Sequence, residues 1–142
     1  PPPIKFEAGT QRVSQAVAFA AAVRYLQHLG MENVEAWEHE LGARLVEGVQ
    51  KIDGVRLLGP TDPTKRAGLV ALAIEGVHPH DVGQLLDTQG IAVRVGHHCA
   101  QPLHRCAGVT ASTRASTYIY NTTEDVDAFL KALAEVRPYF GF

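Results

Sequence analysis

Apolar residues recur at three- and four-residue steps through the first third of the chain. In residues 13–29 and 32–52 this spacing predicts two successive helices, separated by Gly30, a residue typical of helix ends. The first segment is so rich in apolar residues that we expect it to form a long buried helix.

Shorter apolar runs alternate with turn residues in the rest of the chain and predict strands and short helices. The expected strands are residues 55–58, 69–74, 91–95 and 113–120. A short helix starts at Pro79 and ends near Gly90, residues 96–108 are irregular or briefly helical, and a final helix covers 124–136 behind a cap at Thr122 or Thr123. This order of elements predicts an α+β domain, in which a small antiparallel or mixed sheet carries helices on one face.

Composition and charge narrow the class of protein. The chain has 142 residues, of which 46% are hydrophobic, enough for one domain with a core. Its net charge of −2 argues against nucleic acid or an anionic membrane as the main partner. No apolar run approaches the roughly 20 residues that span a bilayer, and no secretory signal opens the chain. Two cysteines make no disulfide framework, so we expect reduced thiols in a cytoplasmic protein.

Residues 94–102, Arg-Val-Gly-His-His-Cys-Ala-Gln-Pro, concentrate reactive side chains. The thiol of Cys99 follows a predicted strand, has His97 and His98 before it, and has Arg94 five residues earlier. Cationic neighbours favour a thiolate, the form that attacks sulfur. A lone cysteine is more often a small buried residue, but a polar loop with glycine and proline is a poor place for one. We therefore interpret Cys99 as a nucleophile.

The same region also permits a zinc interpretation. Three histidines and two cysteines fall within ten residues, namely His97, His98, Cys99, His104 and Cys106. Imidazole and thiolate are zinc ligands, but the spacing lacks the C-x-x-C pair of familiar structural sites. Cys106 lies in an apolar stretch, where we expect a small core residue.

Arg114 places a charge inside the predicted strand 113–120. It is either an arginine at the edge of the sheet, whose head group reaches solvent, or a bidentate clamp for a carboxylate. The strand pattern by itself leaves both interpretations open.

Several motifs together resemble the group II, SufS-type cysteine desulfurases over nearly the whole chain. Residues 94–100 resemble the signature R-x-G-x-H-C-A of that family. Residues 6–10 resemble the F-E-A-G-T stretch that opens the small-domain half of these enzymes, and residues 114–122 resemble R-A-S-x-x-x-Y-N-T. Gln11 departs from the pattern, because the family commonly has proline there.

The resemblance implies a fold, a cofactor and a reaction. Residues 6–142 would be the C-terminal small domain of the aspartate aminotransferase-like fold, fold type I of pyridoxal 5′-phosphate (PLP) enzymes, and residues 1–5 a linker. The family enzyme is a homodimer in which PLP serves as an electron sink. It takes sulfur from L-cysteine as a persulfide, releases alanine and supplies iron–sulfur cluster assembly.

The resemblance also assigns residues by position. Cys99 matches the cysteine that carries the persulfide, and Arg114 matches the arginine that holds the substrate carboxylate. Arg94 and His98 match residues beside the catalytic loop, where they would contribute to substrate binding. Gly9 and Thr10 match the segment that reaches the PLP phosphate of the other subunit.

The Schiff-base lysine of the family lies in its large domain, within an S-x-H-K stretch. None of the four lysines of this chain, Lys5, Lys51, Lys65 and Lys131, has that context. We therefore expect this chain to be part of the enzyme and to be inactive alone. The alternatives are a selenocysteine lyase of the same family and a non-enzymatic zinc or sulfur-relay module.

His80 bears on the sulfur acceptor. In some SufS-type enzymes a histidine at this position replaces a zinc ligand of a zinc-containing, SufU-type acceptor, and imidazole is a competent ligand for that exchange. A SufE-type acceptor needs no such ligand. His80 therefore favours a SufU-type acceptor, although His78 and His80 also read as ordinary polar residues at a helix start.

Overall fold

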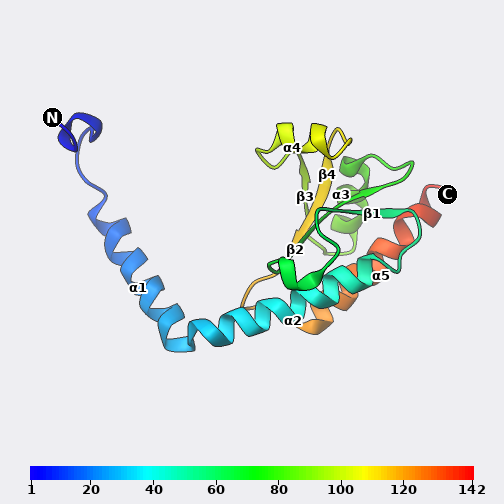
Figure 1. Cartoon of the computed structure of the whole chain (residues 1–142), viewed down its shortest axis with the longest axis horizontal. Coiled ribbons are helices and arrows are strands. Elements are labelled where there is room, and N and C mark those ends of the chain that lie inside the picture. The colour runs from blue at the N-terminus through cyan, green and yellow to red at the C-terminus, as the bar shows by residue number, and fades with distance from the viewer. The chain divides into compact units, whose positions relative to one another are not determined.

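The computed structural model describes residues 1–142, which form two compact units, Pro1–Glu35 and Ala36–Phe142. The first unit holds a 3-10 turn (η1, Ile4–Phe6), α1 (Val13–Leu29) and the start of α2 (Met31–Val49), which continues into the second unit. The second unit then holds β1 (Val55–Leu58), η2 (Pro63–Lys65), β2 (Leu69–Ile74), α3 (Pro79–Thr88), β3 (Arg94–Gly96), α4 (Gln101–Cys106), β4 (Ser112–Ser116) and α5 (Thr123–Tyr139) (Figure 1). None of the helices combines the length and apolar character that a membrane span requires.

The four strands form one antiparallel sheet in the order β1-β2-β4-β3. Strand β4 is therefore an interior strand, although it comes last in the sequence. Its residues alternate between the two faces of the sheet, as in any strand. Thr113 and Ala115 face the core opposite Leu72 and Val70, whereas Ser112 and Arg114 face the other way.

A single hydrophobic core lies between one face of the sheet and three helices. Alternate residues of β2 enter it, and α2, α3 and α5 supply most of the rest, including Leu45, Leu86 and Leu133. The short helix α4 contributes nothing to this core and lies beyond the ends of β3 and β4 (Figure 1). The predicted α+β arrangement, with helices on one face of a small sheet, is confirmed.

Polar contacts connect α2 with α5 and with the segment that precedes α5. The Arg44 guanidinium on α2 makes two hydrogen bonds to the Asp127 carboxylate on α5, at 2.7 and 2.6 Å. The indole of Trp37 donates to the carbonyl of Asn121 at 3.2 Å. Helices α2 and α5 pack closely at Gly48, because a Cβ at that position would stand 2.2 Å from a methyl group of Leu130.

Two expectations about element boundaries need correction. Strand β3 starts at Arg94 and not at residue 91, because Ile91 instead donates its amide to the Leu86 carbonyl at the end of α3. Strand β4 ends at Ser116 and not at residue 120. The chain turns there, and the Tyr118 amide donates to the Asn121 side chain at 3.0 Å.

The expectation for residues 13–29 is confirmed as a helix and wrong as to burial. No residue of α1 is buried, and Val13, Val17 and Phe19 are 63–72% exposed. Apolar periodicity shows that a helix has an apolar face, but that face is buried only where another element packs against it. Within this chain the apolar surface of α1 stays exposed.

Helix α5 begins with a reciprocal cap. The Thr122 hydroxyl accepts from the Asp125 amide at 3.3 Å, and the Asp125 carboxylate accepts from the Thr122 amide at 3.0 Å. These two bonds satisfy amides that the first helical turn leaves without partners. The cap fixes the start of the helix that delivers Val126, Phe129 and Leu133 to the core.

We predict that Thr122→Ala lowers the free energy of unfolding of the chain by about 1 kcal/mol, because it removes the hydroxyl that accepts from the Asp125 amide. Thr123→Ala is the matched control, since the Thr123 hydroxyl donates to the neighbouring Glu124 side chain and not to the cap of the helix. Urea unfolding followed by circular dichroism measures both. Equal effects of the two substitutions would show that the cap does not stabilise α5.

Candidate active site

Three arginines lie on the sheet face opposite the core. Arg114 of β4 pairs with Arg94 of β3 on one side and with Ala71 of β2 on the other. Arg56 of β1 faces the same way, because it pairs with Ala73, but its guanidinium donates to the Ala107 carbonyl. No salt bridge in the structure involves Arg94 or Arg114, so this face is suited to an anion.

The connection from β3 to α4 carries the candidate nucleophile in an uncommon backbone conformation. His98 and Cys99 both have positive φ angles, 53° and 60°. Two consecutive non-glycine residues in the left-handed region cost about 1 kcal/mol or more each, and surrounding contacts must hold them there. The Ala100 amide closes the turn by donating to the His97 carbonyl at 2.8 Å. Such strain at a loop that carries a nucleophile is typical of functional sites.

Cys99 is an exposed free thiol at this turn. The Arg94 side chain approaches it, with 4.0 Å between the guanidinium Nη2 and the Cys99 Sγ. A guanidinium donor stabilises negative charge on an acceptor atom. The guanidinium of Arg94, five residues before Cys99 in the sequence, therefore lies beside the thiol.

Behind the Cys99 turn, a buried serine joins two histidines. The Ser112 hydroxyl lies 3.0 Å from His98 Nε2 and 2.9 Å from His104 Nε2. The other ring nitrogen of His104, Nδ1, lies 3.0 Å from the Ala100 carbonyl oxygen. Ser112 is fully buried and His104 is 6% exposed. The conformation of the turn is therefore tied to β4 through these side chains.

Burial lowers the pKa of His98 below its usual range, and the nearby charge of Arg114 lowers it further. The His98 ring is consequently neutral near pH 7. Its Nδ1 atom is buried and has no hydrogen-bond partner, and neither has the Nε atom of Arg114. A buried acceptor and a buried donor without partners are exceptions that need an explanation.

Arg114 is not the edge arginine that one interpretation of the sequence allowed. It sits in an interior strand, is half-buried and is flanked by paired strands on both sides. A half-buried guanidinium without a carboxylate partner is typical of a residue that binds a ligand, so the carboxylate-clamp interpretation gains support.

Cys106 differs from its prediction. We expected a small core residue, but Cys106 ends the short helix α4 and is exposed. The reason is that α4 packs outside the core. The structure also lacks a zinc site of the kind that the sequence allowed, since no three His, Cys, Asp or Glu side chains are grouped so that they could hold a metal ion.

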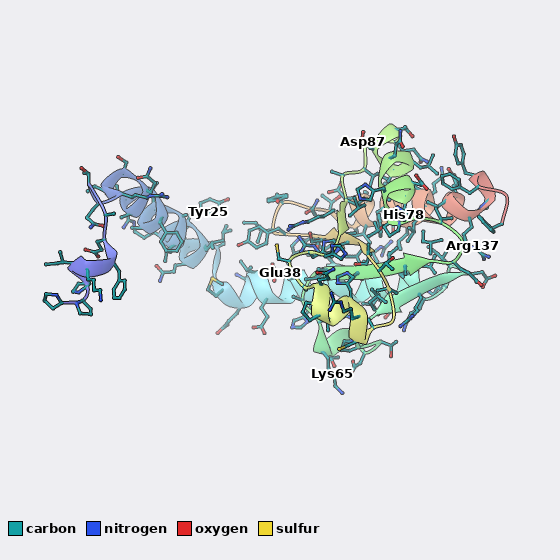
Figure 2. The ribbon with its side chains drawn as sticks, turned by 90° about the horizontal axis from the view of Figure 1, so that it is seen from above. Tyr25, Glu38, Lys65, His78, Asp87 and Arg137 are labelled. Carbon is teal, nitrogen blue, oxygen red and sulfur yellow. The ribbon has the colours of Figure 1, made fainter.

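The remaining candidates lie elsewhere. His80 is exposed in the first turn of α3, where its amide lies 3.3 Å from the Nδ1 of His78 and the two rings stack with centroids 5.4 Å apart. His78 is the cap of this helix, and Figure 2 labels it. Gly9 and Thr10 are exposed residues of the Pro1–Glu35 unit, and Gly9 has a φ of 79°.

The role of Ser112 was not foreseen from the sequence, and His104 was considered only as a zinc ligand. One signal was available for Ser112. It stands two residues before Arg114 in a predicted strand region, so the two side chains share a face. The contact of Ser112 with two histidines could not be read from the sequence, because it depends on the left-handed turn at His98.

Known proteins match this chain over most of its length. The aminotransferase class-V family profile matches residues 1–129. A probable cysteine desulfurase 2 of Mycobacterium leprae is 50% identical over 141 residues, which are 99% of this chain and 34% of that protein. A probable cysteine desulfurase of Halalkalibacterium halodurans is 48% identical over 139 residues, covering 98% of this chain and 34% of that protein.

Solved structures agree with this assignment. A cysteine desulfurase of Thermococcus onnurineus NA1 in its apo form matches with a TM-score of 0.87 and 41% identity, over 95% of this chain and 34% of that one. The cysteine desulfurase CsdA of Escherichia coli matches with a TM-score of 0.86 and 35% identity, over 96% and 33% of the two chains. This chain thus spans about a third of the length of the relatives it matches. Its sequence and its fold place it in the aminotransferase class-V family.

Proposed function

We propose that this chain is the C-terminal, small-domain portion of a SufS-type cysteine desulfurase. The enzyme would take sulfur from L-cysteine as a persulfide on Cys99, release alanine and supply iron–sulfur cluster assembly in the cytoplasm. The observation that carries the proposal is the exposed thiol of Cys99 on a strained turn, 4.0 Å from Arg94, beside a sheet face that presents Arg114 without a carboxylate partner. The names of the relatives support the reaction class.

The residues of this chain have separate tasks in the proposed reaction. Arg114 holds the substrate carboxylate, and Arg94 lies beside the sulfur of Cys99, where its guanidinium can donate to the reacting atoms. The thiolate attacks the sulfur of L-cysteine, so a sulfur–sulfur bond forms and the carbon–sulfur bond breaks. The electron pair of the broken bond stays with the carbon, which takes up a proton and leaves as the methyl group of alanine. The product on the protein is the Cys99 persulfide.

The carbon–sulfur bond can break this way only if the substrate carbon skeleton accepts electrons, and PLP supplies that electron sink when it is bound. The residues of this chain fit a contribution to its phosphate. Gly9 has open space where a side chain would stand, and the adjacent Thr10 is an exposed residue, so backbone and hydroxyl donors are available. The Schiff-base lysine would come from the part of the enzyme that this chain does not span.

Exposed apolar surface in the first unit is consistent with a partner surface in the complete enzyme. Ile4, Phe6 and Phe19 are 72–76% exposed. Large exposed apolar patches mark interaction sites in stable proteins. We propose that the large domain and the second subunit of a homodimer cover this surface, as in the family that the sequence resembles.

For the acceptor, we propose a zinc-bearing SufU-type protein in preference to a SufE-type protein. His80 supports this choice because its side chain is exposed at the start of a helix. Its neighbour His78 uses Nδ1 to cap the helix, so His80 is the histidine of the pair that is available as a ligand.

Cys99→Ser in the complete enzyme should abolish persulfide formation while binding of PLP and L-cysteine persists, because serine cannot carry the transferred sulfur. Cys106→Ser is the matched control, since Cys106 is the other exposed thiol and should be dispensable. Mass-spectrometric mapping after reaction with L-cysteine measures the outcome. Persulfide found on Cys106 instead of Cys99 would refute the assignment.

Arg114→Lys should raise the KM for L-cysteine about tenfold or more and leave the PLP absorbance intact, because an ammonium group cannot reproduce two parallel hydrogen bonds to a carboxylate. Arg56→Lys is the control, since Arg56 lies on the same sheet face but is engaged with the Ala107 carbonyl. Steady-state kinetics separates the two. An unchanged KM in Arg114→Lys would make Arg114 a structural residue.

His80→Ala should leave persulfide formation on Cys99 intact and abolish the stimulation by a zinc-bearing acceptor. His78→Asn is the control, because asparagine retains a cap for α3 while removing the neighbouring imidazole. Turnover measured with and without the acceptor tests the difference. If His80→Ala is stimulated as strongly as the parent, the choice of a SufU-type acceptor loses its support.

A further inference from the structure

Two buried side chains contact the residues on either side of Cys99. On one side, the Nε2 of His98 lies 3.0 Å from the Ser112 hydroxyl. On the other side, the Ala100 carbonyl oxygen lies 3.0 Å from the Nδ1 of His104 and accepts from the His104 amide across 3.2 Å. The Ser112 hydroxyl and the His104 Nε2, 2.9 Å apart, join the two sides. This set of His98, Ala100, His104 and Ser112, here called the Cys99 clamp, closes around the nucleophile without using the thiol itself.

The side chains that close the Cys99 clamp belong to the packed part of the domain. Ser112 is fully buried, and as the first residue of β4 it pairs with Gly96 at the end of β3. His104 is 6% exposed. Buried polar groups that bond to one another favour a single arrangement, because breaking one of these bonds leaves a buried group without a partner. The clamp therefore connects the turn to the sheet.

Local backbone preference works against the observed turn. His98 and Cys99 both have left-handed φ angles, which are unfavourable for residues that have a side chain. Gly96 and Gly108 flank the turn and α4, and both have positive φ angles, 119° and 69°, which glycine adopts with the most freedom. The thiol adds little support, because its contact with Arg94, at 4.0 Å, is long for a hydrogen bond. The position of the sulfur atom thus depends on the contacts of its neighbours.

We propose that Ser112 and His104 are positioning residues for sulfur transfer, which hold the Cys99 thiolate within reach of the substrate sulfur. The inference rests on the desulfurase proposed above, in which a bond forms between the two sulfur atoms while the carbon–sulfur bond of L-cysteine breaks and its electron pair, with a proton, remains with alanine. Neither residue touches the substrate, whose carboxylate is assigned to Arg114. Misplacing a reacting group by about 1 Å can slow a reaction about a hundredfold. Loss of the Cys99 clamp should accordingly slow the transfer and leave the binding of L-cysteine largely unchanged.

The first test measures the alanine that the complete enzyme forms in its first turnover, without a sulfur acceptor, over a range of L-cysteine concentrations. Ser112→Ala should lower the maximal first-turnover rate about tenfold or more, while the half-saturating concentration of L-cysteine changes less than about twofold. Thr110→Ala is the matched control, since Thr110 is an exposed residue two positions earlier and should leave both quantities unchanged. An unchanged first-turnover rate in Ser112→Ala, or a lower rate with an equally large rise of the half-saturating concentration, would overturn the proposal.

Substitutions of His104 test whether the two residues act as one unit. His104→Leu should slow the first turnover, and His104→Gln should slow it less, because an amide can both donate to and accept from the Ser112 hydroxyl. The double variant Ser112→Ala/His104→Leu should be at most about twofold slower than the slower single variant, since either substitution already opens the Cys99 clamp. Effects that multiply in the double variant would show two independent roles and contradict the clamp.

Hydrogen–deuterium exchange of the complete enzyme, without substrate, tests the Cys99 clamp apart from catalysis. Peptides that cover residues 97–104 contain the Ala100 amide, which donates to the His97 carbonyl at 2.8 Å. In Ser112→Ala these peptides should exchange about tenfold faster, because the turn opens more often. Peptides of α5 should exchange as in the parent, which shows that the fold persists. Unchanged exchange in residues 97–104 would mean that Ser112 does not hold the turn.

The measurements separate failure of this inference from failure of the proposed function. A complete enzyme that does not act on L-cysteine would refute the desulfurase proposal, while the exchange experiment would still decide whether Ser112 holds the turn. An active enzyme in which Ser112→Ala loosens the turn and leaves the first-turnover rate unchanged would refute the positioning role alone.

Discussion

The alternation of strand β4 is the constraint on which both the core and the candidate site depend. Strand β4 lies between β2 and β3, and its side chains alternate between the two faces of the sheet. Each residue therefore faces either the helices or the opposite side. Thr113 and Ala115 complete the core against the helices, while Ser112 and Arg114 face the Cys99 turn. A shift of register by one residue would exchange the two sets and place a guanidinium in the core. The site is therefore fixed by the same packing that stabilises the domain.

That coupling explains why a strained turn can persist at the nucleophile. His98 and Cys99 adopt left-handed backbone conformations, which are unfavourable for residues that have a side chain. The His98 ring is held by Ser112, and the carbonyl of Ala100 is held by the ring and the amide of His104. Side-chain contacts on both sides of Cys99 thus offset the free-energy cost of the left-handed backbone. They hold the turn in a conformation in which the thiol is exposed beside Arg94. The candidate site is preorganised by buried polar contacts and not by the loop itself.

Much of the fold followed from local pattern. The periodicity of residues 32–52, the short runs at 55–58 and 69–74, and the cap at Thr122 predict α2, β1, β2 and α5 because these elements bury one regular face. What failed depended on neighbours that are distant in sequence. Cys106 looked like a core residue, yet α4 packs outside the core, and α1 has an apolar surface that no part of this chain buries. Cys99 and Arg114 were identified by residue type and by resemblance, whereas the contribution of Ser112 requires the three-dimensional position of His98.

We propose that the Arg114 face of the sheet binds the carboxylate of the amino acid whose sulfur Cys99 accepts. A crystal structure of the complete enzyme with PLP and L-alanine, the proposed product, tests this most directly. We expect the alanine carboxylate to lie on the two terminal amino groups of Arg114, with its methyl group directed toward the Cys99 sulfur. A carboxylate bound by other residues, with Arg114 free of ligand, would contradict it.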